Sequence, residues 1–442
     1  MDAATLPVLY RDHLATLTAG YRQVLVDHGL DAIVLVSGRG AAKSRFDDQH
    51  WPTVVTPHFA HWVPLPASDA FLVITGAAPP RLVRVVADDY WDSAPAAESD
   101  HWLEHVAQVE VADLAAVVGE LPRGRIAIIG DDVPDGLGAL TNPPEVIAAL
   151  DALRTRKTPY EVECLAEATA RAVRGHQHVE DLFARLDASE LACHLAFLAA
   201  SGQSEADTPY QGIVARGRNA AVLHHIHYAK RIPGHGLPGP LTVDSLLVDA
   251  GARYLGYCAD ITRTWARGTT DGAMLFGGLI AGVDRLQQRL CGEIAVGLAY
   301  EALHDRAHVL LAELLVELAI GKGDPAVLVE RGVTRALFPH GLGHSLGIQV
   351  HDVGMKLTAP RPDNRFLRNT SVITAGQVFT IEPGCYVIDA LIDPLRADDR
   401  RELLDWKAIE AIRPFGGVRI EDDVVVGADG IRNLTRQAWA AA

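Results

Sequence analysis

The chain has 442 residues, of which 49% are hydrophobic and 22% are charged, and its formal net charge is −16. This length and balance allow two ordinary domains with real cores, and they exclude disordered, fibrous and collagen-like proteins. The acidic charge without a basic run argues against nucleic acid and membrane as partners, and no apolar run approaches the roughly 20 residues that a membrane helix needs.

The five cysteines are scattered and form no CxxC or CxxH pair. This spacing argues against a disulfide framework and against a thiolate zinc site, and it favours a reducing compartment. The N-terminal residues alternate apolar and charged positions at helical spacing and show no secretory apolar region. We therefore expect a soluble, cytoplasmic protein.

The first third of the chain alternates helical and strand patterns, which is typical of an α/β layer domain. We predict a helix over 14–30 and strands over 32–36, 71–74, 81–86 and 125–129. The segment SGRGAAKS after the first strand is not a phosphate-binding P-loop, because Ser37 and Ala42 stand where that motif needs glycines.

The remainder of the chain reads as a larger α+β domain. A helix-rich stretch begins near 144, and the charged segment 153–159 separates two different patterns, so we predict domains over 1–155 and 156–442. Strand patterns begin near 212, give way to helices over 274–320, and return over 347–426. The glycines of GLGHSLG at 341–347 lack the strand–turn–helix context of a dinucleotide site.

Two aspartates stand in strand-like surroundings in LLVDAGARYLGYCADITRTW. If this segment is a hairpin that turns at 254–255, Asp249 and Asp260 lie directly opposite each other on one face. Two carboxylates that close repel each other unless one is protonated or a cation lies between them. The aliphatic neighbours favour burial and hence a metal pair, whereas the alternative is that each aspartate caps a solvated turn.

Three further segments offer ligands. FPHGLGHSLGIQVHDVG contains His340, His344 and His351 without an HExxH pattern, and such histidines form a structural hydrogen-bond network as often as a ligand set. Glu382 and Glu421 lie in apolar strand patterns, where glutamates are rarely buried unless they are paired or bind a metal; the alternative is an edge strand.

Combined, these segments offer two aspartates, two glutamates and a histidine. Such a hard, oxygen-dominated set suits manganese or a similar divalent ion. Four carboxylates exceed the charge of one ion, so two divalent ions per subunit, bridged by carboxylates and a hydroxide, fit the count; this is the pattern of two-metal hydrolysis.

The ordered motifs LVDAGARY, CADITRTW, HGLGHSLGIQVHDVG, TIEPGCY and GVRIEDD resemble those of the pita-bread metallopeptidase family, which includes methionine aminopeptidase, aminopeptidase P and prolidase. DTPYQGIV followed by VLHH, the insertion CYVIDALIDPLRADD, RPFGGVRIEDD, FDDQHWP and VVADDYWDSA are similar to the bacterial prolidase subgroup, which includes the organophosphorus acid anhydrolases. The resemblance implies a pita-bread catalytic domain behind a smaller, creatinase-like α/β domain.

The resemblance implies a role for each matching residue. Five would hold the metals, with Asp249 bidentate on one ion, Asp260 and Glu421 bridging, His344 on one ion, and Glu382 also assisting proton transfer as a catalytic residue. His351, also catalytic, would contact the substrate near the scissile carbonyl. The other substrate-binding residues would be His224, His340 in the outer site, Arg368 and Arg419 on the substrate carboxylate, and Tyr210, Asp48 and Trp91 at the small end of the pocket.

Several of these positions have alternative interpretations. The two arginines could instead pair with carboxylates at the surface, and the histidines around His224 could form a solvated cluster. Asp48 and Trp91, expected to reach across a homodimer interface, could be a helix cap and a core residue. Cys385 stands where the family usually has an aliphatic residue, and we expect it to tune the pocket without adding chemistry.

The function that the resemblance implies is a dinuclear, manganese-dependent dipeptidase, which cleaves Xaa-Pro dipeptides with a metal-bridging hydroxide. Hydrolysis of organophosphorus esters is a plausible side activity, because the same hydroxide and Lewis acids suit a phosphoryl centre. The alternative is an aminopeptidase P, which releases the N-terminal residue ahead of proline from longer peptides. A non-catalytic pita-bread binding module is disfavoured, because such relatives have lost metal ligands that are all present here.

Overall fold

The computed structural model describes residues 5–86, 98–131, 133, 140–185, 188–231 and 244–442. Trp91 lies outside these residues. The chain forms two compact units: residues 1–164 with 254–257 make up unit 1, and residues 165–253 with 258–442 make up unit 2. Each unit is described by itself.

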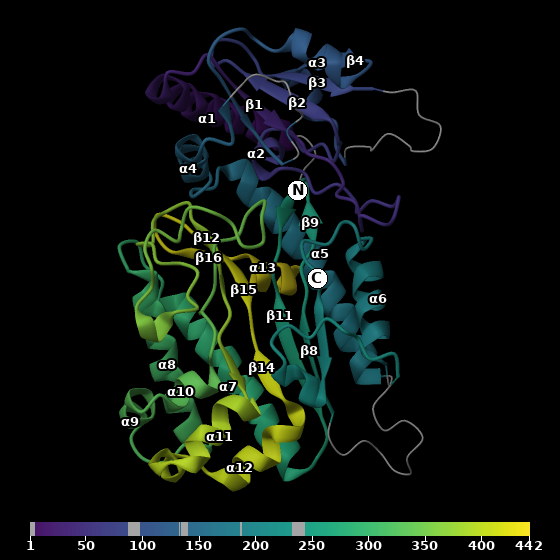
Figure 1. The fold of residues 1–442 in the computed structure, drawn as a ribbon. Helices are drawn as coiled ribbons and strands as arrows, with labels where there is room; N and C mark the ends of the chain where they lie inside the picture. Colours follow the sequence, from purple (N-terminus) through teal and green to yellow (C-terminus); the bar gives the residue numbers. More distant parts are fainter. Residues whose placement is uncertain (1–4, 87–97, 132, 134–139, 186–187, 232–243) are drawn as a thin grey trace. The chain divides into compact units, whose positions relative to one another are not determined.

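Unit 1 is built on a mixed sheet of strand order β4-β3-β2-β1-β5-β6 (Figure 1). Strand β1 runs antiparallel to β2 and parallel to β5. The elements in chain order are α1 Thr5–His28, β1 Ala32–Val36, α2 Pro57–Ala60, β2 Ala70–Ile74, β3 Arg81–Val85, the 3-10 turn η1 Leu103–His105, β4 Ala107–Val111, α3 Leu114–Glu120, β5 Ile126–Ile129, β6 Leu140–Thr141, α4 Pro144–Leu153 and the first residues of α5 Pro159–Arg185.

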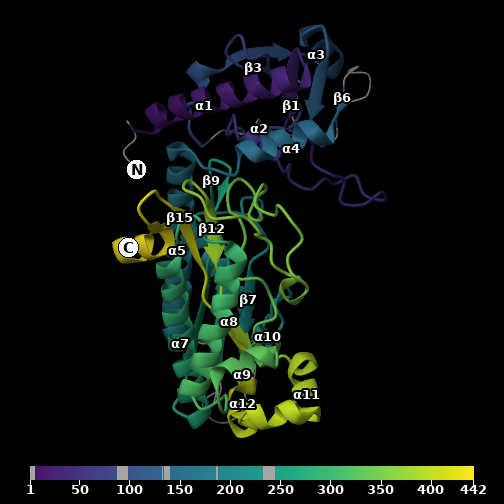
Figure 2. The same cartoon turned by 90° about the vertical axis from the view of Figure 1, so that its left-hand side faces the viewer.

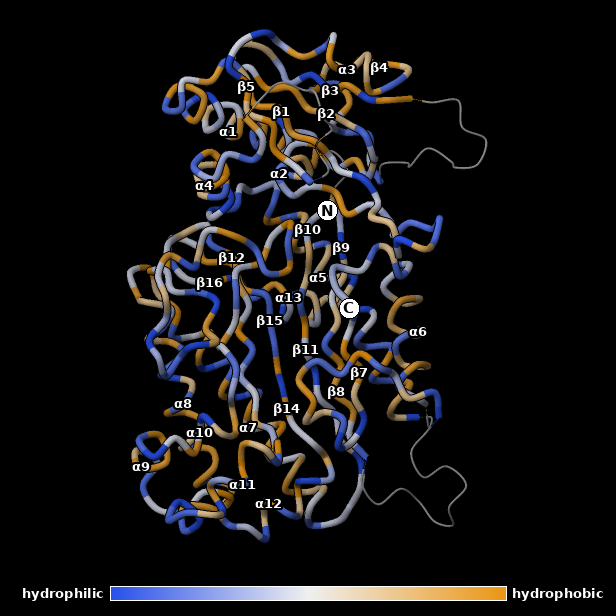
Figure 3. Tube along the Cα trace, in the orientation of Figure 1, coloured by the Kyte–Doolittle hydropathy of each residue, from blue (hydrophilic) through white to orange (hydrophobic). Residues whose placement is uncertain are grey.

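The sequence of the central strands explains why helices cover both faces of this sheet. All residues of β1, β2 and β5 are buried, as expected for strands that read as continuous apolar runs; Figure 3 shows the apolar residues along β1 and β2. One face packs against α3 through Val117. The strands predicted for this region all exist, and the predicted helix begins earlier, at Thr5, because Leu6, Tyr10 and His13 continue its buried face.

Unit 2 holds most of the helices and three small antiparallel sheets, with strand orders β11-β8-β7, β12-β15-β16 and β13-β14. Its elements are the rest of α5, α6 Glu190–Ser201, β7 Ile213–Arg216, η2 Gly217–Ala221, β8 Asp244–Asp249, β11 Thr262–Arg267, α7 Asp271–Glu293, α8 Tyr300–Glu317, α9 Pro325–Glu330, α10 Val333–Leu337, η3 Pro362–Asn364, β12 Val378–Ile381, β13 Gly384–Tyr386, α11 Asp389–Ala397, η4 Asp399–Leu403, α12 Trp406–Ile412, η5 Arg413–Phe415, β14 Gly417–Arg419, β15 Asp422–Val426, β16 Ile431–Asn433 and α13 Leu434–Ala441. The short strands β9 Arg253–Tyr254 and β10 Tyr257–Cys258 pair with each other, and their residues are divided between the two units.

The main core of unit 2 lies between helices and sheet. Helices α7 and α8 lie side by side in both views (Figures 1 and 2). Their buried faces pack with residues of β12, β14 and β15 in one cluster, within which the rings of Phe276 and Phe415 stack at 4.8 Å. Among the described helices, none has an apolar stretch of the length that a bilayer crossing requires.

The hairpin that carries the two aspartates has a different register from the one predicted. Asp249 pairs with Thr262, so it does not lie directly opposite Asp260. The turn falls at Leu255–Gly256, where both residues have positive φ. Glycine adopts this conformation without steric cost, which favours the turn at Gly256. The resulting offset is two residues, and two residues along a strand return to the same face. The prediction that both aspartates share one face therefore survives the corrected register.

Candidate metal centre

Three sheets of unit 2 contribute to one cluster of ligands. Asp249 ends β8, and Asp260 lies just before β11. Glu382 follows β12, and Glu421 connects β14 to β15 and forms a bridge with Thr262. The cluster is completed by His344, whose backbone N–H lies 3.3 Å from the Thr380 hydroxyl on β12.

The imidazole of His344 is arranged as a metal ligand. Its Nδ1 lies 3.1 Å from the carbonyl oxygen of Ser345, and because a carbonyl only accepts, Nδ1 carries the proton. The lone pair of Nε2 then points at carboxylate oxygens, 3.3 Å from Asp260 Oδ2, 3.8 Å from Glu421 Oε1 and 4.0 Å from Glu382 Oε1. Ligand atoms of Asp260, His344 and Glu421 all lie within 4.8 Å of one another, and the three residues are buried.

The carboxylates of this cluster resist ionisation when no cation lies between them. Burial raises the pKa of Asp260 and Glu421 well above the usual range, and the charge of Asp249 raises both further. Burial and the neighbouring Glu421 raise the pKa of Glu382 to about 8. No described residue hydrogen-bonds to the buried Oε1 of Glu421. A divalent cation would relieve this repulsion and occupy the orphaned oxygen, so the residues fit a metal site.

Two side chains hold Asp249. The Tyr210 hydroxyl lies 2.7 Å from Asp249 Oδ1 and also contacts Asp260 Oδ1, so it stands between the two aspartates. Arg419, which is buried, donates to Asp249 Oδ2 at 2.5 Å and to the Tyr386 hydroxyl at 2.9 Å. Arg419 does pair with a carboxylate, but the pair is buried within the cluster, whereas the sequence alternative was a pair at the surface.

His340 joins the same network from the opposite side. Its Nδ1 donates to the carbonyl of Gly341 at 2.9 Å, and its Nε2 accepts from the Tyr386 hydroxyl at 2.9 Å. Burial, with the nearby charge of Arg419, lowers the pKa of His340 to about 3, so the ring is neutral. Its Nδ1 lies 3.6 Å from Glu382 Oε2. The structure places His340 beside Glu382 of the ligand cluster.

Three predicted substrate residues, His351, Arg368 and His224, have exposed side chains. The exposed His351 meets the ring of His344 edge-on at 4.4 Å between centroids. The side chain of His351 is exposed in part, but partial desolvation of its ring and then the neighbouring His344 lower its pKa to about 3, and Arg368 and His224 lower it further. Arg368 and His224 are both exposed. His351 and Arg368 thus lie close enough to act on the ligand His344, and His224 acts on His351.

Two residues of the site were not assigned from the sequence. Tyr386 connects Arg419 to His340, and Thr262 donates to Glu421 Oε2 at 2.7 Å while it accepts from Arg419 Nε at 3.1 Å. Both stand in motifs that were singled out, TIEPGCY and CADITRTW. Their position directly beside predicted ligands was the available signal, since metal ligands are normally oriented by hydrogen bonds from neighbours.

The sequence matches metallopeptidase family M24 over residues 163–428. The chain belongs to this family. Residues 8–152 match a second family, the N-terminal domain of Xaa-Pro dipeptidases. This M24 chain is 40% identical over 429 residues to a Marinobacter nauticus protein named Xaa-Pro dipeptidase, with 96% of this chain and 97% of that protein covered. It is 39% identical to a protein of the same name from Xanthomonas axonopodis, over the whole of both chains.

Solved M24-type structures share the fold. The aminopeptidase PepP of Pseudomonas aeruginosa aligns with a TM-score of 0.71 at 22% identity, over 98% of both chains. The proline aminopeptidase P II of Yersinia pestis aligns with a TM-score of 0.70 at 20% identity, over 99% of this chain and all of the other. At this identity the likeness confirms the two-domain pita-bread fold predicted from the sequence.

Unit 1 contains a second group with metal-ligand chemistry, formed by the buried His13, His61 and Glu161. It fits an ion less well. His13 uses both ring nitrogens, donating from Nε2 to the His61 carbonyl and accepting at Nδ1 from the Thr158 hydroxyl, each at 2.8 Å. Glu161 already accepts from the Thr158 N–H at 2.8 Å, as a capping box does. His61 Nε2 already lies 3.2 Å from Glu161 Oε1, and the nearby positive charges of Arg154 and Lys157 oppose a further cation.

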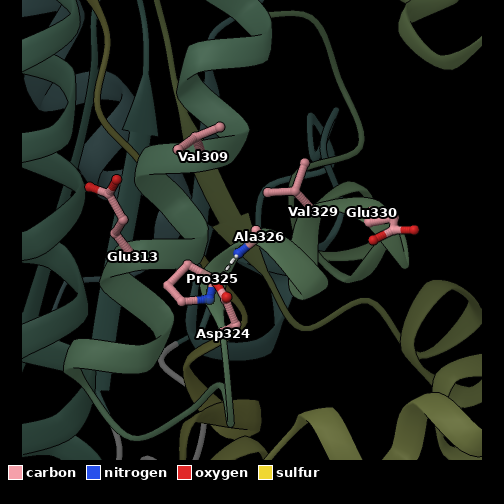
Figure 4. Close-up of a pocket in the computed structure, with 7 residues that line it drawn as sticks. All are labelled: Val309, Glu313, Asp324, Pro325, Ala326, Val329 and Glu330. Atoms are coloured by element: carbon pink, nitrogen blue, oxygen red, sulfur yellow. Dashed lines mark hydrogen bonds between the residues drawn. The ribbon is translucent and has the colours of Figure 1, made fainter.

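One predicted position remains in unit 1, and one pocket lies in unit 2. Asp48, an exposed residue of unit 1, accepts a 3.3 Å hydrogen bond from the Gln49 side chain. A pocket of about 510 Å³ lies between α8 and α9 (Figure 4), and the residues that line it are Val309, Glu313, Asp324, Pro325, Ala326, Val329 and Glu330. Asp324 caps the first turn of α9 there, and none of the predicted site residues lines this pocket.

Proposed function

We propose that this M24 metallopeptidase hydrolyses Xaa-Pro dipeptides. The observation that carries the proposal is the match of both units: the N-terminal residues match a domain family named for Xaa-Pro dipeptidases, and the proteins of that name align over nearly the whole chain. The carboxylate and histidine cluster of unit 2 supplies the chemistry that such a hydrolase needs.

We infer that the metal centre holds two divalent ions. Asp249, Asp260, His344, Glu382 and Glu421 would hold them, and their oxygen-rich donor set favours Mn²⁺ over zinc. When bound, such ions acidify a water and polarise the scissile carbonyl. The protein orients the ligands through hydrogen bonds: Tyr210 and Arg419 donate to Asp249, and Thr262 donates to Glu421. Glu382 would pass a proton to the leaving proline nitrogen.

Recognition of the substrate falls on its free carboxylate and its proline ring, because an Xaa-Pro amide has no N–H. Of the two predicted arginines, Arg368 is the better partner for the carboxylate, since it is exposed and its charge reaches His344 and His351. Arg419 is already engaged by Asp249, Tyr386 and Thr262. We therefore assign the carboxylate to Arg368, paired through the two parallel donors of its guanidinium.

His351 and His224 would flank the scissile bond. The low pKa of His351 keeps its imidazole neutral near pH 7, so one ring N–H can donate to a carbonyl oxygen while charge develops there. His340, held by Gly341 and Tyr386, would line the outer part of the same site. Tyr210 would close the small end of the pocket.

We also propose a cytoplasmic homodimer. The cytoplasmic location is supported by the five cysteines, which are all buried free thiols. The homodimer is supported by the loop that contains Asp48, where Phe46, Trp51 and Val54 are 88%, 59% and 77% exposed. Large apolar side chains gathered in one loop favour a protein partner. Sedimentation velocity of the purified chain measures the oligomeric state.

The test of the proposed function compares Leu-Pro with Leu-Pro-Gly, using metal-stripped protein with and without added Mn²⁺. We expect metal-dependent cleavage of the dipeptide alone. Cleavage of the tripeptide would instead favour an aminopeptidase P, which is what the solved structures of the same fold are called. Stoichiometric metal without cleavage of either peptide would refute the substrate assignment, and absence of bound metal would refute the metal centre. The side activity is measured with a phosphotriester under the same conditions.

A further inference from the structure

A buried carboxylate at the start of α6 has no role in the site described so far. Glu190 has no exposed surface, and its two oxygens accept four hydrogen bonds. Oε1 accepts from the Arg216 N–H and the Asn219 side chain, both at 2.8 Å. Oε2 accepts from His225 Nε2 at 2.8 Å and from the Ala229 N–H at 2.7 Å.

These four donors bracket a single segment of irregular chain. Arg216 ends β7, Asn219 lies in η2, and His225 and Ala229 lie in the stretch that follows. The backbone adds one more bond at the same end, from the Leu191 N–H to the Ala229 carbonyl at 3.2 Å. Both ends and the middle of segment 216–229 are therefore attached to one carboxylate.

The ionised carboxylate suits this task better than any neutral side chain. Burial by itself raises the pKa of Glu190, but the hydrogen bonds from Ala229, Arg216, Asn219 and His225 lower it overall, so the group is charged at neutral pH. Only the ionised form accepts at both oxygens without a proton of its own to place. Hydrogen bonds to a buried charge are also the stronger kind.

Segment 216–229 is hydrogen-bonded to the residues that follow Tyr210, which contacts two of the proposed metal ligands. The Gln211 side chain donates to the Ile226 carbonyl at 3.1 Å, and the Tyr228 hydroxyl donates to the Gly212 carbonyl. Residues 211 and 212 directly follow Tyr210, whose hydroxyl lies between Asp249 and Asp260. His224 belongs to this segment and directly precedes the anchored His225.

We propose that Glu190 is a positioning residue that holds segment 216–229 and so places His224 against the substrate. Among the described residues, the exposed side chain of His224 has no hydrogen bond or ion pair that could fix it, and its backbone is held through the neighbouring His225. The inference rests on the proposed function in one respect, that His224 touches the substrate. Glu190 itself touches neither substrate nor metal ligand.

The test is a double-mutant cycle of Glu190→Gln and His224→Ala. The glutamine keeps the shape of the side chain but replaces one acceptor oxygen by an NH₂ group, which opposes the Ala229 N–H. If Glu190 acts through His224, each single variant lowers kcat/KM for Leu-Pro by about tenfold, the effect of one lost hydrogen bond to a charged group. In the His224→Ala background, Glu190→Gln then changes kcat/KM by less than about twofold.

Glu161→Gln is the matched control, because Glu161 is an equally buried, multiply bonded carboxylate of unit 1. Glu161→Gln is expected to lower Tm about as much as Glu190→Gln does. It should change kcat/KM by the same factor in the wild-type and the His224→Ala backgrounds. Hydrogen–deuterium exchange gives a readout that does not depend on activity. Glu190→Gln should speed exchange in peptides covering 222–229 with unchanged metal content, and Glu161→Gln should not. If Glu190→Gln fails to fold, Asn219→Ala removes one of the four donors and takes its place.

The outcomes separate this inference from the proposed function. Cleavage of Leu-Pro by the wild type, together with equal factors for Glu190→Gln in both backgrounds, would overturn the positioning role and leave the function standing. Unchanged exchange over 222–229 would overturn it as well. Failure of the wild type to cleave any Xaa-Pro dipeptide would overturn the proposed function, and with it the substrate role of His224.

Discussion

Thr262 offers a sharp test of how the metal ligands are held in place. Its hydroxyl, which is fully buried, donates to Glu421 Oε2 at 2.7 Å and accepts from Arg419 Nε at 3.1 Å. The other oxygen of Glu421 has no hydrogen-bond partner among the described residues. Thr262→Val keeps the volume and branching of the side chain, yet it removes the hydrogen bond that orients the Glu421 carboxylate.

The expected cost can be stated for metal and for stability. Loss of an outer partner of a metal ligand typically weakens metal binding by about 10–100-fold, which corresponds to about 1.4–2.7 kcal/mol. A buried polar group left without its hydrogen-bond partner costs about 1–3 kcal/mol of folding free energy, so the metal-free variant is also destabilised. We expect Mn²⁺ affinity, measured by isothermal titration calorimetry, to fall by at least tenfold.

Thr264 provides the matched control two residues along the same strand. Its hydroxyl is also buried, but it bonds the backbone of Arg419, donating to the carbonyl at 3.0 Å and accepting from the N–H at 3.2 Å. Thr264→Val should therefore lower stability while Mn²⁺ affinity stays within about twofold, because it orients no carboxylate. Equal loss of metal affinity in the two variants, or none in Thr262→Val, would refute the reasoning.

Two further predictions concern the substrate carboxylate and the charge of the site. Arg368→Ala should raise KM for Leu-Pro by about 10–100-fold, because a hydrogen bond to a charged group contributes about 1.5–3 kcal/mol. Arg365→Ala, at another exposed arginine, should leave this KM unchanged. With an uncharged Leu-Pro amide as substrate, Arg368→Ala should have no such effect on KM. In metal-stripped protein, the pKa of Glu382 is raised to about 8, so the folded state keeps a proton that the unfolded state has released. The Tm of the metal-free protein should therefore fall from pH 6.5 to 8, and added Mn²⁺ should remove that slope. A flat Tm profile without metal would contradict the assignment.

The sequence predicted those parts of the molecule that depend on local pattern. Strand β1 was predicted to the residue, because five consecutive apolar residues are closed by Asp31 and Ser37. Asp249, Asp260 and Glu421 were predicted as ligands because carboxylates in apolar strands are costly unless they bind something, and the structure brings the three together in one cluster. These inferences need only the neighbours along the chain.

What the sequence could not supply is the pairing of distant segments. The hairpin register depended on whether the turn would use Gly256, and a shift of that turn changes every cross-strand partner. The role of Tyr386 depends on contacts with Arg419 and His340 from other segments, which no spacing along the chain reveals. The same holds for Glu190, whose four donors span residues 216–229.

The side chains around Asp249 explain how such a cluster of acids can fold before it binds metal. Arg419 supplies a positive charge at 2.5 Å, and Tyr210 supplies a hydroxyl at 2.7 Å, so the carboxylate is fixed and compensated within the protein. Asp260 and Glu421 are hydrogen-bonded by Tyr210 and Thr262, and burial with the neighbouring carboxylates raises the pKa of both, which favours their protonated forms when no metal is bound. Because the carboxylates are already in position, a metal ion that binds would displace their protons, and little free energy would be spent on ordering the side chains. For this reason metal affinity should increase with pH.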